Sequence, residues 1–257
     1  MYDVVYRGAS ENTGPSPAIW ADCPTADIIA YPGRGMHFFD DFENFSQHIT
    51  DQDTQKYASY IDTGVTAKQL GGVAAVNHVI EIAGNDADND EFVLATHGPL
   101  AEVSDTAGDE RKLWFEARFY TPDDLAANKW GMFIGLGYDF GGAAPLSKTL
   151  CLTDDDSALG AFSFLGFHCD QAAPTALDCV YKADGQTAQV NIAGVKTLVA
   201  STWYRVGFVF DPSKPTANRI TWYVDGVAQT TFVTGTNIAA ATFPDAEPMG
   251  LVHATKV

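Results

Sequence analysis

Three aspartates at alternate positions, Asp86, Asp88 and Asp90, have the residue type and spacing of an ion-binding loop. A hard cation such as Ca²⁺ needs several oxygen ligands that converge on it. Calcium loops of this kind continue with a glycine and end on a bidentate glutamate, but here the glycine is missing and the closing position is His97. We therefore favour an acidic hairpin turn over a calcium site, and we predict no metal-binding residue.

The residues that hydrolytic or redox chemistry needs do not cluster in the sequence. The histidines lack His-x-His and His-x-x-x-His spacing, and no Gly-x-Ser-x-Gly motif marks a nucleophile. The Glu-x-Asp-x-x-Glu strand motif, with which laminarinase-type jelly rolls supply paired carboxylates, is also absent. We predict no catalytic residue, no cofactor and no enzymatic activity.

Aromatic side chains offer a different kind of site, because an exposed ring face can stack on the apolar side of a sugar. The candidates are Trp114, Trp130, Trp203, Trp222 and Tyr223. Trp203 and Trp222 lie among core-like neighbours, so we expect them to pack between sheets. A carbohydrate-binding, lectin-like site is the alternative.

The four cysteines are too few for a disulfide scaffold, and none forms a Cys-x-x-Cys pair, so zinc is not expected. Cys169 and Cys179 lie in two successive predicted strands and could face each other. A bridge would require Cα atoms within about 7 Å. We expect buried thiols, with a disulfide as the alternative.

Alternating apolar and polar residues predict strands that would position these groups. In the segment 113–120, Phe115 and Phe119 share one face, while Glu116 and Arg118 share the other with Trp114 and Tyr120, so that face is wet or at an interface. Asp-Gly pairs at 184–185 and 225–226 predict two hairpins. Further strands are predicted at 130–140, 203–210 and 220–232, and one short helix at 121–129.

The chain has 15 Lys and Arg against 33 Asp and Glu, a formal net charge of −18. Such a surface does not favour phosphate, so we predict no nucleic-acid partner. No apolar run is long enough to span a bilayer, so no membrane partner is predicted either. The start of the chain lacks the pattern of an ordinary secretion signal.

The composition changes near residue 35. Residues 1–35 contain four of the twelve prolines and no sustained period, yet they include Trp20 and several isoleucines. We predict an extended N-terminal arm over 1–35 that lies on its own sandwich or, with slight preference, on a neighbouring subunit. Residues 36–257 are predicted to form one all-β domain.

Four segments in a fixed order carry a resemblance to a known family: LWFEARFY, FIGLGYDF, TWYRVGFVFDPS and ITWYVDGV. They resemble the laminin G-like or concanavalin A-like jelly-roll β-sandwich of two antiparallel sheets. More narrowly, residues 36–233 resemble jelly-roll structural proteins of tailed bacteriophages, which likewise open with a phrase like HFFDDFENF and pass an Asn/Asp-rich turn.

The resemblance implies a non-enzymatic virion component. Its most direct form is a head decoration or cement protein that binds the major capsid protein on the capsid surface and self-associates, often as a homotrimer, after assembly in the host cytoplasm. The alternative is a tail or fibre adhesin with a carbohydrate-binding jelly roll. The metal sites of laminin G domains and legume-type lectins have no match in this sequence.

Overall fold

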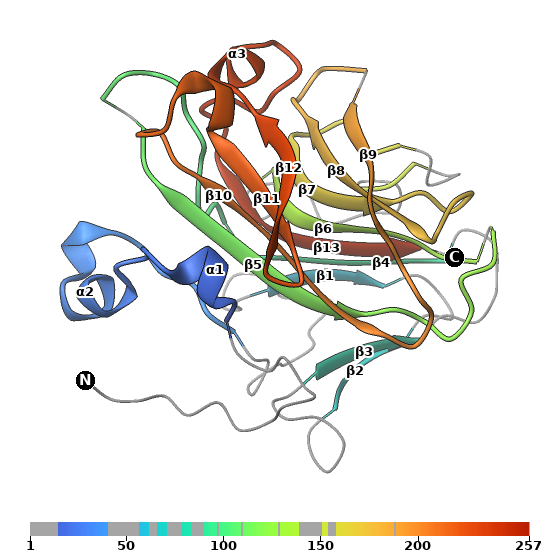
Figure 1. Ribbon diagram of the computed structural model, residues 1–257. Helices are drawn as coiled ribbons and strands as arrows, with labels where there is room; N and C mark the ends of the chain where they lie inside the picture. Colours follow the sequence, from blue (N-terminus) through green and yellow to red (C-terminus); the bar gives the residue numbers. More distant parts are fainter. Residues whose placement is uncertain are drawn as a thin grey trace.

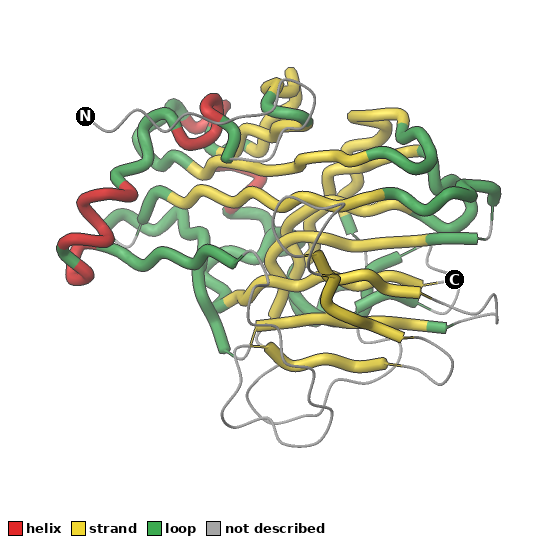
Figure 2. Tube along the Cα trace, turned by 90° about the horizontal axis from the view of Figure 1, so that it is seen from below, coloured by secondary structure: helices red, strands yellow, loops and turns green. Residues whose placement is uncertain are grey.

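The computed structural model describes residues 15–40, 57–61, 66–70, 79–83, 90–96, 98–108, 110–127, 129–138, 151–153, 158–187 and 189–256. Within these residues the chain is almost entirely β-structure, as the sequence predicts. Two antiparallel sheets form the sandwich, and the few helical turns lie outside the strands (Figures 1 and 2). No helix among the described residues is long and apolar enough to cross a membrane.

The larger sheet has seven strands in the order β1-β4-β13-β6-β7-β8-β9. Its strands span Tyr57–Ile61 (β1), Glu91–Thr96 (β4), Met249–Lys256 (β13), Gly131–Tyr138 (β6), Phe164–Cys169 (β7), Ala176–Lys182 (β8) and Val190–Thr197 (β9). The last strand, β13, lies between β4 and β6, so the C-terminal end of the chain completes the middle of this sheet.

The smaller sheet has four strands in the order β12-β11-β10-β5. They span Val227–Val233 (β12), Ile220–Val224 (β11), Trp203–Phe210 (β10) and Leu113–Tyr120 (β5). A separate pair, β2 (Thr66–Leu70) and β3 (Val79–Ala83), forms a two-stranded sheet. Two short helical turns accompany the later strands, η2 (Thr216–Asn218) and α3 (Gly235–Ile238).

The core between the two sheets consists of the inward-facing residues of the alternating strands. Phe115 on β5 stacks on Phe208 on β10 at 5.0 Å between ring centroids. Trp222 on β11 contacts the rings of Phe208 at 5.4 Å and of Phe167, on the opposite sheet, at 5.3 Å. Edge-to-face packing of this kind adds to the burial of apolar area. The pattern that predicts the strands therefore also builds the core.

Both predicted hairpins are present. Asp225 and Gly226 join β11 to β12 with φ values of 51° and 74°, the positive values that a two-residue turn with a right-handed strand twist requires. Around Asp184 and Gly185, β8 and β9 pair as an antiparallel hairpin with a longer connection.

The helix predicted at 121–129 is wrong for the described residues of that segment, which have no helical backbone. The Thr121 hydroxyl does not cap a helix, because it donates to the carbonyls of Val199 and Thr202. The Asp124 carboxylate accepts the amide of Ala126 in a local turn instead.

The N-terminal segment forms helical turns where the sequence shows only proline-rich chain. These are α1 (Pro17–Trp20), α2 (Thr25–Ala30) and η1 (Pro32–Arg34). Proline is favourable at the first helical position, as in α1 and η1, because that N–H has no intrahelical partner. In both views α2 lies at the left edge, away from the sandwich (Figures 1 and 2).

Residues 151–153 and 158–163 lie over the outer face of the seven-stranded sheet. Cys151, Leu152 and Leu159 pack in one buried cluster with Phe133 and Phe164 of the sheet. Two buried lysines of the sheet donate to carbonyls of this covering segment, Lys182 to Leu159 at 2.9 Å and Lys256 to Thr153 at 2.7 Å. The described part of this face is therefore closed by the chain itself.

Candidate functional site

The outer face of the four-stranded sheet gathers aromatic and charged side chains from alternate strand positions. β5 and β10 pair in register, with Trp203 opposite Tyr120, Arg205 opposite Arg118 and Gly207 opposite Glu116. This arrangement confirms that Trp114, Glu116, Arg118 and Tyr120 share the face predicted to be wet or at an interface. We call this surface the outer face; it includes Trp114, Glu116, Arg118, Tyr120, Trp203, Arg205, Gly207, Val209, Thr221 and Tyr223.

The five aromatic sugar-binding candidates divide between the two sides of the sheet. Trp114, Trp203 and Tyr223 lie on the outer face, whereas Trp130 and Trp222 are buried in the core. Core packing of Trp222 is thus confirmed, but core packing of Trp203 is wrong, since this side chain is 37% exposed. The register explains the difference, because Trp203 opposes Tyr120 and shares its outward direction.

The helix α1 covers the middle of the outer face. The Ser16 amide donates to both carboxylate oxygens of Glu116, at 2.9 and 3.1 Å, and the Trp20 indole N–H donates to the same carboxylate. Ile19 is only 2% exposed and lies over Gly207, where an added Cβ would come within 2.7 Å of its Cδ1 atom. Residues 16–20 therefore lie on their own sandwich in this structure.

A glycine inside a strand otherwise rich in large residues is a sequence signal for such a close approach. Gly207 lies within the segment WYRVGFVF, so the sequence could have predicted where on this strand another segment approaches closely. The identity of the segment that occupies it could not.

Glu116 is the buried charge at the centre of this contact. Its side chain is 6% exposed and lies 3.4 Å from the guanidinium of Arg205, whose side chain is 9% exposed. Burial raises the pKa of Glu116 above its usual range, and the hydrogen bonds from Ser16 and Trp20 and the charge of Arg205 oppose this change. A buried carboxylate that accepts several hydrogen bonds in this way fixes the position of α1.

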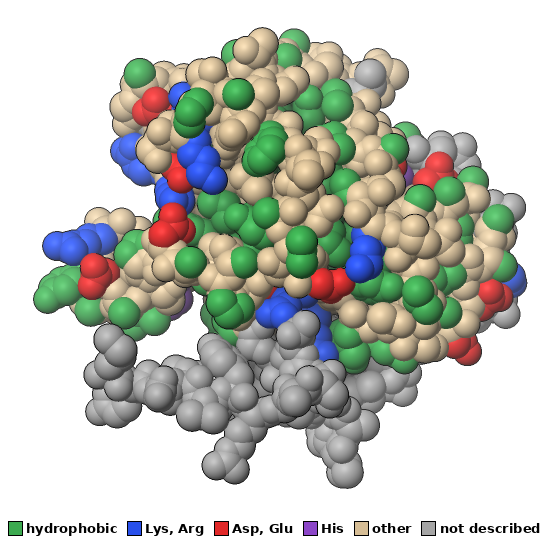
Figure 3. All heavy atoms as spheres, in the orientation of Figure 1, with side chains coloured by type: hydrophobic (Ala, Val, Ile, Leu, Met, Phe, Trp, Pro, Cys, Tyr) green, Lys and Arg blue, Asp and Glu red, His purple; other side chains and the backbone are tan. Residues whose placement is uncertain are grey.

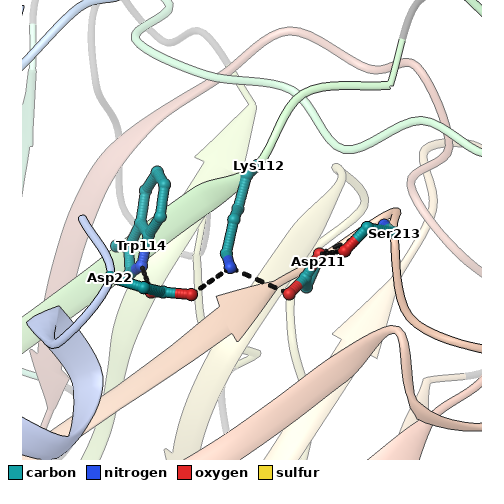
Figure 4. Close-up of polar contacts among 5 residues, drawn as sticks. All are labelled: Asp22, Lys112, Trp114, Asp211 and Ser213. Carbon is teal, nitrogen blue, oxygen red and sulfur yellow. Dashed lines mark hydrogen bonds and ion pairs between the residues drawn. The ribbon is translucent and has the colours of Figure 1, made fainter. Parts of the chain in front are cut away.

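A second polar cluster fixes the chain just after α1 (Figure 4). Lys112 forms ion pairs with Asp22 and, at 2.8 Å, with Asp211. Asp22 also accepts the indole N–H of Trp114 at 3.0 Å, and Asp211 accepts the hydroxyl of Ser213 at 2.6 Å. The cluster thus joins the N-terminal segment to the start of β5 and the end of β10.

The charges of this cluster stabilise one another. The hydrogen bond from Lys112 is the main cause that lowers the pKa of Asp22. Burial acts to lower the pKa of Lys112, but the hydrogen bonds and charges of Asp211 and Asp22 outweigh it and raise that pKa. Every carboxylate and ammonium group in this cluster has a protein partner, so the cluster has a structural role. We call Asp22, Lys112, Trp114, Asp211 and Ser213 the clasp.

The remaining end of the outer face is open. Tyr120 is 49% exposed and Trp203 37% exposed, and their ring centroids lie 5.1 Å apart with an interplanar angle of 56°. The guanidinium carbon of Arg118 lies 4.1 Å from the centroid of the Trp203 ring. We call Arg118, Tyr120 and Trp203 the open end of the outer face. Sequence reasoning placed Arg118 and Tyr120 on this face without naming them as a site.

The other residues considered in the sequence form no comparable site in the described chain. Asp86 and Asp88 lie outside the described residues, and Asp90 is 7% exposed. Among the described residues, no group of three or more His, Cys, Asp or Glu side chains could hold a metal ion. His253 contacts the Phe133 carbonyl through Nδ1 at 3.2 Å, and burial lowers its pKa to about 4.

Cys169 and Cys179 are both free and buried on adjacent strands, β7 and β8. The register places Cys179 opposite Phe167, so the two thiols are diagonal neighbours and not directly opposed. Burial raises the pKa of both thiols. The expectation of buried thiols is confirmed.

Comparisons with known proteins give similarities of architecture. The chain matches no protein-family model and no curated protein. A protein of unknown function from Shewanella oneidensis MR-1 is 16% identical with a TM-score of 0.47, over 80% of this chain and 72% of that one. A conserved carbohydrate esterase from Shiga toxin-encoding bacteriophage phi24B is 16% identical with a TM-score of 0.41, over 80% and 92%.

A third similar structure is the GH16 protein of a Bacteroides ovatus mixed linkage glucan PUL, in complex with its G4G4G3G product. It is 11% identical with a TM-score of 0.42, over 86% of each chain. Together with the two sheets described above, these similarities agree with the predicted jelly-roll, concanavalin A-like β-sandwich. At these identities they concern the fold alone.

The similarities also correct the prediction that this chain has no enzymatic activity. The phage protein is a carbohydrate esterase, and the Bacteroides protein was solved with its product. The prediction that this chain has no enzymatic activity is therefore not retained.

Proposed function

We propose that this protein binds carbohydrate at the open end of the outer face. The observation that carries the proposal is the pair of exposed aromatic rings, Tyr120 and Trp203, fixed on adjacent strands of a rigid sheet. Two tilted rings at this distance present a hydrophobic surface on which the apolar side of a pyranose can stack. This is the adhesin alternative of the sequence analysis, with its site now assigned to named residues.

The geometry favours binding over a purely structural role for these rings. Trp203 has a partner for one of its faces in Arg118, yet more than a third of its surface stays exposed. Both residues lie on strands whose pairing is continuous through Trp203 and Tyr120, so little conformational entropy is lost when a ligand is bound.

The test is a glycan array, followed by calorimetric titration of the strongest ligand. Trp203→Ala and Tyr120→Ala should each weaken binding at least about tenfold, which corresponds to about 1.4 kcal/mol. Tyr31→Ala is the matched control, because Tyr31 is 61% exposed and lies on the N-terminal segment. Unchanged binding in the Trp203 variant, or no glycan ligand at all, contradicts the proposal.

A second candidate function rests on the segment around α2 and η1, which projects from the sandwich (Figures 1 and 3). Ile29, Tyr31, Met36 and Phe39 are between 57% and 70% exposed. Large apolar side chains gathered on one projecting segment are typical of a protein–protein contact. We propose this segment as the contact through which the protein attaches to the major capsid protein of a virion; self-association as a homotrimer is what the sequence resemblance implies.

Copy number in purified particles tests this second candidate. Quantitative mass spectrometry should give a simple ratio to the major shell protein, such as one or one third. The double variant Tyr31→Ser and Phe39→Ser should lose incorporation, whereas Val227→Ser, at a 64% exposed valine of β12, should keep it. Absence of the chain from particles contradicts this candidate and leaves carbohydrate binding untouched.

A further inference from the structure

The exposed apolar side chains of the sandwich gather at one end. Among the described residues after residue 40, the large hydrophobic side chains that are exposed are Tyr120, Val199, Trp203 and Val227. Tyr120 and Trp203 belong to the open end, and Val199 precedes Trp203 in the connection between β9 and β10. An apolar surface gathered in one place indicates a contact site, whereas apolar side chains scattered singly do not. Val199 is therefore a candidate member of the site.

The β9–β10 connection, residues 198–202, lies beside the end of β5 and is bonded to it (Figure 1). The hydroxyl of Thr121, the residue after β5, donates to the Val199 carbonyl at 2.7 Å, and the Val199 amide donates to the Tyr204 hydroxyl at 2.8 Å. Both backbone polar groups of Val199 are thus bonded, so its backbone is fixed. Its side chain is nevertheless 61% exposed.

The same connection holds a strained residue. Ser201 has a φ of 52°, in the left-handed region that costs energy for any residue except glycine. Its amide donates to the Pro122 carbonyl at 2.9 Å, and the next residue, Thr202, donates through its amide to the Thr121 hydroxyl at 2.9 Å. Strain of this kind persists only where the surroundings enforce the conformation, and it is frequent in segments that bind ligands. The connection is thus a shaped, rigid segment.

A valine offers a ligand a different contact from that of the two rings. An aromatic face stacks on the C–H groups of a pyranose, whereas an aliphatic side chain gains free energy only by burying another apolar group. A sugar hydroxyl buried against Val199 would lose its hydrogen bonds to water without gaining another. A methyl group carried by the sugar would lose none. Val199 is therefore suited to a methyl group.

We propose that the ligand at the open end is a saccharide that bears a methyl group, either in an acetamido substituent or as a 6-deoxy carbon, and that Val199 contacts this methyl group. The inference rests on the proposed carbohydrate-binding function and adds the class of sugar. Tyr120 ends β5 and Trp203 begins β10, so Val199 lies beyond the strand positions that carry the rings. A substituent that projects from the stacked sugar would reach it.

The experiment compares sugars that differ in one methyl group. An N-acetyl sugar is paired with its N-formyl analogue, and a 6-deoxy sugar is paired with a sugar that lacks any carbon at that position. The full chain is titrated calorimetrically with both pairs, each presented on the glycan that binds most tightly in the array. We expect the methyl-bearing member of one pair to bind at least about threefold more tightly, as expected for burial of one methyl group. The pair that shows the difference identifies the source of the methyl group.

Variants assign this difference to Val199. Val199→Thr has nearly the same shape but replaces one methyl group by a hydroxyl, so it should remove the difference within the pair. Val227→Thr is the matched control, because Val227 is a 64% exposed valine on β12, and it should keep the difference. Both side chains are exposed, so both variants should keep the urea unfolding midpoint of the original chain. Trp203→Ala should weaken both members of the pair alike.

The possible failures are distinguishable. If neither pair shows a difference, or if Val199→Thr keeps it, the inference is wrong although carbohydrate binding at the open end stands. If no saccharide depends on Trp203, the proposed function fails and the inference fails with it. A difference that Val199→Thr removes and Val227→Thr keeps supports both.

Discussion

The outer faces of the two sheets carry similar strands but are completed differently. On the seven-stranded sheet, residues 151–153 and 158–163 cover the aromatic side chains, and Lys182 and Lys256 donate hydrogen bonds to carbonyls of this covering segment. On the four-stranded sheet, α1 covers the middle, and the end with Tyr120 and Trp203 stays open. Burial stabilises the first face, whereas the open end of the second can contact another molecule.

This contrast is visible within a single residue type. Trp222 and Trp203 lie on neighbouring strands of the same sheet, and one is 0% exposed while the other is 37% exposed. Only the direction of the side chain relative to the sheet differs. The role of these tryptophans thus follows from the face of the sheet to which their strand position points, because successive side chains of a strand point to opposite faces.

The largest expected effect separates these two tryptophans. Trp222→Ala should lower the free energy of unfolding by about 3–5 kcal/mol, because it leaves a cavity beside Phe167 and Phe208. Trp203→Ala should lower it by no more than about 1 kcal/mol, since it removes only partly exposed contacts with Arg118 and Tyr120. Urea unfolding measures both, and equal losses would contradict the division between core and outer face.

The next effect concerns the covered middle of the outer face. Glu116→Gln should cost about 1–3 kcal/mol, because Arg205 and the donors of Ser16 and Trp20 lose a charged acceptor in a buried site. Hydrogen exchange should become faster at the amides of Ile19 and Trp20, which hydrogen-bond to the Ser16 carbonyl.

The exposed carboxylate of Glu102 provides the matched control for this variant. Glu102→Gln should change neither the unfolding free energy nor exchange in α1. If Glu116→Gln behaves like this control, α1 is not held by Glu116, and the difference between the covered and open parts of the face loses its basis.

His253 provides a pH-dependent test of the region between the sheets. Its pKa in the folded protein is lowered to about 4 by burial, against an ordinary value of 6.5, so the folded state binds fewer protons in this interval. Stability should therefore be complete above pH 6.5 and should fall as the pH drops towards 4, by up to about 3 kcal/mol. His253→Gln should flatten this slope in urea titrations between pH 4 and 6.5, and an unchanged slope contradicts the assignment.

The smallest effect is expected at the exposed clasp. Asp22→Asn should lower the unfolding free energy by less than about 1 kcal/mol, because the Asp22 side chain is 62% exposed and water screens its pair with Lys112. Thermal unfolding at low and high salt measures it. The lowered pKa of Asp22 predicts that this contribution disappears as the pH falls below the ordinary value of 3.8. A loss as large as that of Glu116→Gln would show that the clasp, and not the buried carboxylate, holds α1.

Much of the sandwich could be predicted because its signals are local. Alternation over 113–120 and 203–210 predicts both strands with their observed bounds, and Asp225-Gly226 has the turn conformation that its residues favour. The alternation along β5, in which Phe115 and Phe119 face the core, also predicts that Arg118 and Tyr120 face away from it.

The contacts that build the site could not be predicted, because they depend on distant pairings. Alternation along β10 puts Trp203 on the face opposite Tyr204, Val206 and Phe208, but its neighbour Tyr120 lies 83 positions earlier in the sequence (203 − 120) and follows only from the register of β5 and β10. The position of α1 depends on Glu116 and Gly207, which no pattern within residues 1–35 indicates. The helix at 121–129 failed because Thr121 bonds to the β9–β10 connection and not to its own segment.

The five tryptophans of the chain report on whether carbohydrate binds at the open end of the outer face. Each gives one indole N–H signal in a ¹H–¹⁵N NMR spectrum, assignable by single Trp→Phe variants. On titration with a saccharide ligand, we expect the Trp203 signal to shift and the signals of the buried Trp130 and Trp222 to stay unchanged. A saccharide that binds without moving the Trp203 signal, or that moves only Trp20 and Trp114, would contradict it.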